Sequence, residues 1–155
     1  MGATNPQLAQ NYLRTKVFTA TAEQLQMMLY DGAIRFCEQA RAALIEKKYE
    51  QSYNLISRVQ KIVTELSCSL KPQLAKDLCS RLGALYDYVY RKLIEANVEH
   101  KLESLDEALS LLRYQRETWA MLMEQTSRQK AASAANKLEM PAPSERMEAT
   151  ISLQG

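Results

Sequence analysis

The sequence predicts an all-α protein, an antiparallel up-down four-helix bundle with a disordered C-terminal tail. Three observations support this fold. Glycine and proline number only four each and aromatic residues make up 7% of the chain, a composition typical of helices rather than sheets. Four stretches repeat apolar residues at steps of three and four, the period of one helical face. The connections between them are short, so consecutive helices must reverse direction.

A chain of 155 residues fits one domain with terminal extensions. We expect residues 1–20 to form the N-terminal segment, residues 21–127 the bundle and residues 128–155 the disordered tail. The tail begins where the apolar periodicity stops, and it contains an alanine-rich stretch followed by Pro141 and Pro143.

The first predicted helix begins at Thr21. Thr21 and Gln24, three residues later, have the spacing of a capping box, in which each side chain bonds the other residue's backbone N–H. The helix should run to about Glu46, where a polar corner starts. Its core stripe is predicted at Leu25, Met28, Leu29, Gly32, Phe36, Ala40 and Leu44.

The next two predicted helices are separated by Pro72. Proline disfavours helical geometry in the residue before it, so the second helix should stop at or before Lys71 and the third should start with Pro72. The second helix is predicted to bury Tyr53, Ile56, Val59, Val63, Leu66 and Leu70. The third, ending near Val98, is predicted to bury Leu74, Leu78, Leu82, Leu85, Val89, Leu93 and Ala96.

The fourth predicted helix opens at Ser104. Ser104 and Glu107 have the spacing of a second capping box. The apolar positions that follow are Leu105, Leu109, Leu112, Trp119 and Leu122.

Several helices carry more apolar side chains than one core stripe requires. The surplus residues, which lie off the predicted stripes, are Met27, Tyr30, Ile34, Tyr86, Tyr90, Leu111, Tyr114 and Met121. A contiguous apolar patch on a monomer usually marks a partner site, and methionine and tyrosine adapt well to such surfaces. Two other interpretations stay open: the surplus residues widen an ordinary core, or they seal a homodimer.

Charge and residue types exclude several classes of function. The formal net charge is +2 with both signs mixed, so no nucleic acid is expected. The three cysteines, Cys37, Cys68 and Cys79, lack metal-site spacing and indicate a reducing compartment. No stretch is long and apolar enough for membrane insertion, so we expect a cytoplasmic protein. The one histidine, His100, should lie in a solvated loop, and we expect no catalytic residue, metal or cofactor.

Three blocks of sequence together resemble the FliS family of flagellar export chaperones. The first runs from Tyr12 to Thr21 and continues with Leu25 and the residues from Met28 to Ala33. The second holds Leu85-Tyr86-Asp87-Tyr88 with Arg91, Leu93, Ala96 and Asn97, and the third holds Arg116 and Trp119. The blocks occur in the family's order and cover about Tyr12 to Leu122.

The resemblance implies a chaperone without catalytic activity. Its client would be the disordered C-terminal segment of flagellin, which it would keep from polymerising prematurely and present to the flagellar export gate. The resemblance also implies that the N-terminal segment covers the client groove through Tyr12 and Val17. The expected groove residues are Leu29, Tyr30, Ile34, Tyr86 and Tyr90. The alternative is a helical homodimerisation or adaptor module without chaperone activity.

Overall fold

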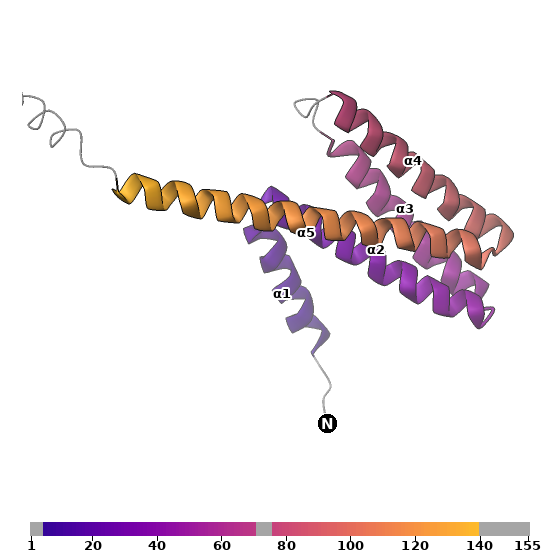
Figure 1. Cartoon of the computed structure of the whole chain (residues 1–155). Coiled ribbons are helices and arrows are strands. Elements are labelled where there is room, and N and C mark those ends of the chain that lie inside the picture. Colours follow the sequence, from indigo (N-terminus) through magenta and orange to yellow (C-terminus); the bar gives the residue numbers. More distant parts are fainter. Residues whose placement is uncertain (1–4, 71–75, 140–155) are drawn as a thin grey trace, which may run out of the picture. The chain divides into compact units, whose positions relative to one another are not determined.

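The computed structural model describes residues 5–70 and 76–139, which form five α-helices and no strand. Figure 1 traces the helices in chain order: α1 (Pro6–Thr19), α2 (Ala22–Ile45), α3 (Tyr49–Cys68), α4 (Lys76–Glu99) and α5 (Leu102–Glu139). The all-α class predicted from the sequence is confirmed. The chain divides into two units, Met1–Trp119 and Ala120–Gly155, which are described in turn. None of the described helices combines the length and apolarity needed to cross a membrane.

The start of α2 is the predicted capping box. The backbone N–H of Gln24 donates to Thr21 Oγ1 at 3.2 Å, and the N–H of Thr21 donates to Gln24 Oε1 at 3.0 Å. These two bonds satisfy groups that every helix start leaves free. The corner after Ile45 is also as predicted, since Lys47 takes a left-handed φ of 60° and α3 begins at Tyr49.

The capping box predicted at Ser104 is wrong. The helix α5 begins two residues earlier, with Leu102, and the N–H of Leu105 donates to the carbonyl of Lys101. Ser104 is therefore inside the first turn, where it is buried. The reason is the tight reversal after α4, in which His100 adopts a left-handed φ of 52° and leaves only two residues between the helices.

The core of the first unit lies between α2, α3, α4 and the first part of α5. The predicted core positions Val59 and Val63 on α3 and Leu93 on α4 are confirmed, each at most 1% exposed. Four predicted core residues are wrong: Leu25, Tyr53, Leu78 and Leu122 are 36%, 58%, 47% and 50% exposed. The largest contributions come from Ile56, Val59, Val63, Leu66, Tyr86, Val89, Leu93, Leu105, Leu109 and Leu112.

The buried face of α2 differs from the predicted one in the first part of the helix, whereas the predicted core residues Ala40 and Leu44 are buried. Ala33 and Cys37 are fully buried, whereas Gly32 and Phe36, one position before each, are half-buried. One position along a helix is a rotation of about 100°, and the small residues face inward because they let the neighbouring helices approach closely. Burial raises the pKa of the Cys37 thiol to about 12, so Cys37 packs as a small apolar side chain.

Neighbouring helices of the first unit pack against each other along the chain and through ion pairs. The helix α2 packs along α3, and α3 packs along α4. Between α2 and α5, Asp31 pairs with Arg116 at 2.6 Å and Arg41 with Asp106 at 2.7 Å. Residue numbers thus rise along α2 while those of the partners fall along α5, so these two helices run in opposite directions.

The second unit is described from Ala120 to Glu139, and all of it belongs to the helix α5. The disordered tail predicted from Arg128 is therefore corrected for residues 128–139, which are helical. Four alanines within Lys130–Asn136 explain the difference, since alanine has the highest helix propensity and needs no tertiary contact to express it. Residues 140–155, as well as Pro72 and Leu74, lie outside the described residues.

Candidate protein-binding surface

Two of the predicted groove residues, Tyr30 and Tyr86, lie in the core. Each is 2% exposed, and their hydroxyl oxygens are 2.5 Å apart, with α2 and α4 supplying one ring each. The prediction that they lie off the core stripes is wrong because the two hydroxyls satisfy each other, which removes the usual cost of burying a polar group. Burial, with the hydrogen bond to Tyr30, raises the pKa of Tyr86.

The other predicted groove residues of α2 and α4 reach the surface to different extents. Leu29 and Ile34 are half-buried and pack against the core, so only part of each side chain meets solvent. Tyr90 is 36% exposed. Of the surplus residues on α5, Leu111 is half-buried and Tyr114 is exposed.

The largest exposed apolar feature of α4 is a stripe of three residues spaced four apart. Tyr90, Ile94 and Val98 are each at least 36% exposed. Tyr90 and Ile94 lie one position after the core residues Val89 and Leu93, and Val98 lies two positions after the core residue Ala96. Apolar surface therefore continues from the core face of α4 onto one flank. We call Tyr53, Tyr90, Ile94 and Val98 the α3–α4 patch.

Tyr53 belongs with this stripe because the two helix ends meet. The rings of Tyr49, at the start of α3, and His100, just after α4, stack with their centroids 4.0 Å apart. Tyr53 follows Tyr49 by one helical turn and is 58% exposed. The start of α3 and the end of α4 thus present apolar side chains at the same end of the first unit.

The opposite flank of α4 is polar and engaged with α5. The Nζ atom of Lys92 lies 3.2 Å from a carboxylate oxygen of Glu95 and 3.4 Å from one of Glu107. The Nζ atom of Lys101 lies 2.9 Å from the other carboxylate oxygen of Glu95. The hydroxyl of Tyr88 donates to Glu107. Hydrogen bonds from Lys101 and Lys92 lower the pKa of Glu95 to about 2. A partner of α4 therefore meets an apolar surface on one flank and a closed ionic seam on the other.

The N-terminal segment contains a helix that the sequence analysis did not foresee. Asn5 caps α1 by accepting the N–H of Gln7 at 3.1 Å, and Pro6 takes the first helical position. The Asn5-Pro6 pair was the available sequence signal. None of the residues of α1 is buried, and its exposed large apolar side chains are Leu8, Tyr12, Leu13, Val17 and Phe18.

An isolated helix of 14 residues is marginal in water. The helix α1 has no acidic residue, and Tyr12 and Val17, the two predicted covering residues, are 71% and 42% exposed. Such a helix gains most of its stability by laying its apolar residues on another surface. Its composition therefore marks α1 as a second candidate binding element.

His100 lies in the loop predicted for it and is exposed. Across residues 5–70 and 76–139, no group of three or more His, Cys, Asp and Glu side chains has an arrangement that could hold a metal ion.

Comparisons with known proteins agree on one family. A family model described as "Flagellar protein FliS" matches residues 4–126. The flagellar secretion chaperone FliS of Bacillus subtilis is 31% identical over 124 residues, covering 80% of this chain and 90% of that protein. The Salmonella typhimurium protein of the same name is 27% identical over 124 residues, covering 79% and 92%.

A solved structure has a similar fold. The crystal structure of a bacterial flagellar chaperone aligns with a TM-score of 0.64 at 21% identity. The alignment covers 78% of this chain and 98% of that chain. The sequence matches extend over most of both partners and include α1 to α4 and the first part of α5. The chain therefore belongs to the FliS family of flagellar secretion chaperones.

Proposed function

We propose that this protein is a cytoplasmic export chaperone that binds the disordered C-terminal region of flagellin. In this role it keeps flagellin from polymerising prematurely and delivers it to the flagellar export apparatus. Membership of the FliS family supports the chaperone role. The exposed apolar surface of α4 supports the kind of client, a segment that is unfolded when free and becomes helical as its apolar side enters a groove.

The observation that carries this proposal is the one-sided apolar flank of α4. Tyr90, Ile94 and Val98 extend over two helical turns, the spacing that the apolar face of a client helix would match. The ionic seam on the other flank gives such a client no apolar contact. Ordering the client on binding costs conformational entropy, which lowers the affinity of the complex. The client can therefore be released and exported in an unfolded state.

The predicted site residues take different roles in this proposal. Tyr90 contacts the client directly, and the exposed parts of Leu29 and Ile34 extend the apolar surface. Tyr30 and Tyr86 are buried and support the surface from the core, since their paired hydroxyls fix the spacing of α2 and α4. Tyr12 and Val17 belong to α1, which we propose covers the client groove in the free protein and gives way to the client.

We also propose that α2, α3, α4 and the part of α5 up to Trp119 form an antiparallel up-down four-helix bundle. The shared core and the opposite order of the α2–α5 ion pairs support this arrangement. A bundle of this kind holds a rigid surface while α1 exchanges with the client.

The proposal is tested with the C-terminal segment of the flagellin from the same organism, titrated into the full chain by calorimetry. We expect Ile94→Asp to weaken binding at least about tenfold, because it places a charge in the apolar contact. Ile45→Asp is the matched control, since Ile45 is 56% exposed at the end of α2 and outside the patch. Hydrogen exchange of the complex should be slower on the flank of α4 and faster in α1, because α1 gives way to the client.

Failure to form a complex, or equal losses in Ile94→Asp and Ile45→Asp, would contradict the proposal. The same exposed patch favours one other function, a homodimerisation or adaptor module. Light scattering separates the two: a dimer that persists with client present and dissociates in Ile94→Asp would support the module. Recruitment of the loaded chaperone to the export gate is then measured with the purified complex.

A further inference from the structure

Away from the α3–α4 patch, two arginines of the first unit lie over the same phenyl ring. The guanidinium carbons of Arg35 on α2 and Arg58 on α3 are 5.4 and 5.5 Å from the ring centroid of Phe36. The two guanidinium carbons are therefore at most about 11 Å apart. Both arginines are exposed, and Phe36 is half-buried. The ring holds two cations close together beside a strip of apolar surface.

Neither of these arginines has a carboxylate partner among the described residues. By contrast, Arg41, Arg113 and Arg116 each lie within 2.7 Å of an acidic side chain that belongs to another helix. Two neighbouring guanidinium groups without a counter-charge repel each other, and each offers a fork of N–H donors that matches a carboxylate. The pair is thus complementary to an incoming acidic side chain.

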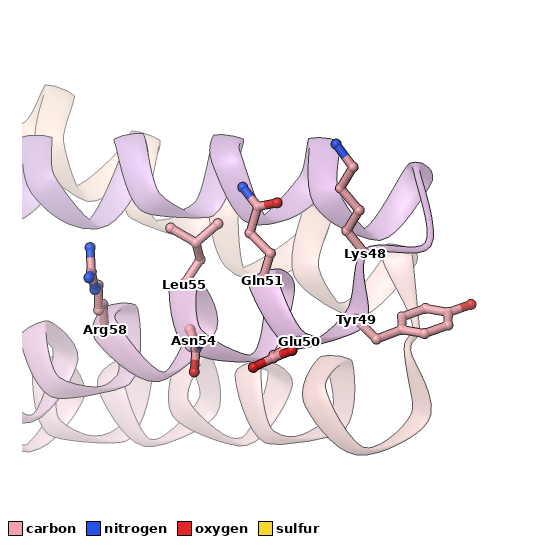
Figure 2. A pocket seen from close by; sticks show the side chains of 7 residues that line it. All are labelled: Lys48, Tyr49, Glu50, Gln51, Asn54, Leu55 and Arg58. Carbon is pink, nitrogen blue, oxygen red and sulfur yellow. The ribbon is translucent and has the colours of Figure 1, made fainter.

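The surface beside Arg58 is hollowed. An open hollow of about 580 Å³ is lined by Lys48, Tyr49, Glu50, Gln51, Asn54, Leu55 and Arg58. Figure 2 shows Lys48, Gln51, Leu55 and Arg58 rising from one side of α3 towards α2. On this side the amide of Gln51, a group that can bond a peptide backbone, lies beside the apolar side chain of Leu55. These are the groups that a short peptide segment requires.

Glu50, the one acidic residue that lines the hollow, and Arg58 lie at opposite ends of it, so a bound peptide would have a preferred orientation. Glu50 lies eight residues from Arg58 along α3, a distance of about 12 Å. Lys48 is already paired with Glu46 at 2.7 Å, so the free positive charge lies at the Arg35–Arg58 end. A bound peptide would place its acidic residues at that end and its amide N–H groups near Glu50.

This site is separate from the α3–α4 patch. Arg58 follows Tyr53 by five residues, which places the two side chains about 140° apart around α3. A client on the α3–α4 patch would therefore leave the other side of α3 open.

We propose that the cluster of Arg35, Phe36 and Arg58, together with the adjoining hollow, binds an acidic peptide segment of a second protein partner. Carboxylates bond the two guanidinium groups, and an apolar side chain packs on Phe36 and Leu55. The protein then holds two partners on opposite sides of α3, and the second is selected by charge rather than by apolar area alone.

The test uses a short fluorescein-labelled peptide of mixed glutamate and leucine, and the same peptide with glutamine in place of glutamate. Fluorescence anisotropy with the full chain should show saturable binding of the acidic peptide only. We expect Arg35→Gln/Arg58→Gln to weaken that binding at least about tenfold, since two charge-assisted hydrogen-bonded pairs are lost. The control Arg81→Gln/Lys130→Gln removes two exposed positive charges elsewhere and should change affinity less than about twofold.

Three results would overturn the proposal: no saturable binding of the acidic peptide, equal losses in the two double variants, or tighter competing binding of a single-stranded oligonucleotide. Because the altered arginines are exposed, urea unfolding should match the unaltered protein. Affinity for the flagellin segment should also be unchanged in Arg35→Gln/Arg58→Gln. This readout separates a failure of the second site from a failure of the proposed chaperone function.

Discussion

The helices α1 and α3 carry similar shares of apolar residues and yet differ in what those residues do. In α3, Ile56, Val59 and Leu66 are fully buried in the core of the first unit. In α1, Leu13 and Phe18 are 53% and 81% exposed, and no residue of the helix is buried. The share of apolar residues is thus common to both helices, but only α3 gathers them on one face and uses that face for folding.

The difference indicates where stability and binding are separated in this protein. Removing a buried side chain of α3 leaves a cavity in the core, and this cavity lowers the free energy of unfolding. Changing α1 alters no core contact, so its effect should appear in partner binding and in the local helix. The predictions below compare buried and exposed positions of the same residue type, from the largest expected effect to the smallest.

The first comparison is Leu66→Ala with Leu13→Ala. Leu66 is fully buried, so its truncation should lower the free energy of unfolding by about 2–5 kcal/mol. Leu13 is 53% exposed on α1, and its truncation should cost less than about 0.5 kcal/mol. Urea unfolding followed by circular dichroism measures both values. Equal losses would mean that α1 is part of the folding core.

The second comparison is Tyr30→Phe with Tyr12→Phe. Removing the hydroxyl of Tyr30 leaves that of Tyr86 buried without its partner, which should cost about 1–3 kcal/mol of unfolding free energy. The same change at the exposed Tyr12 should have no measurable effect on unfolding. In the double variant Tyr30→Phe/Tyr86→Phe most of the loss should be recovered. A double variant less stable than the single one would show that the hydroxyl pair is not the cause.

The third comparison concerns two helix caps. Thr21→Ala removes one half of the capping box of α2 and should lower the unfolding free energy by about 1 kcal/mol. Asn5→Ala removes the cap of α1 and should reduce helicity only there, leaving the urea midpoint unchanged. Backbone chemical shifts report the local helicity of α1. A shifted midpoint in Asn5→Ala would refute the separation of α1 from the folding core.

The smallest effect concerns the ionic seam between α4 and α5. The pKa of Glu95 is lowered to about 2 by hydrogen bonds from Lys101 and Lys92, so the folded state favours its carboxylate form. The resulting stabilisation is complete above the ordinary pKa of 4.5 and is lost as the pH falls towards 2. Glu95→Gln should therefore differ from the unaltered protein at pH 7 and converge with it at low pH.

Urea unfolding across this pH range measures the convergence. Added salt should reduce the difference at pH 7, because the seam is exposed and its charges are screened. The exposed pair of Arg128 with Glu124 in the second unit provides a control, since Glu124→Gln should leave the unfolding of the first unit unchanged at every pH.

The sequence alone determined the family, the all-α class, the capping box of Thr21 and the core positions of α3 and α4 apart from Tyr53, Leu78 and Tyr86. These features depend on residues close together in the chain, where helical period and capping chemistry act locally. Tyr90 was predicted to lie off the core stripe of its helix, and it is 36% exposed. Tyr12 and Val17 were assigned only through the family resemblance, and the binding roles of all three residues stay predictions.

Only the tertiary structure decided which of two adjacent faces of α2 turns inward. Leu25, Phe36, Ala33 and Cys37 give α2 overlapping stripes, and close packing selected the one with small residues. Tyr30 and Tyr86 are 56 positions apart, so their hydroxyl pair could not be seen in any local pattern. The Arg35–Phe36–Arg58 cluster is likewise absent from local sequence, because it exists only where α2 and α3 lie side by side.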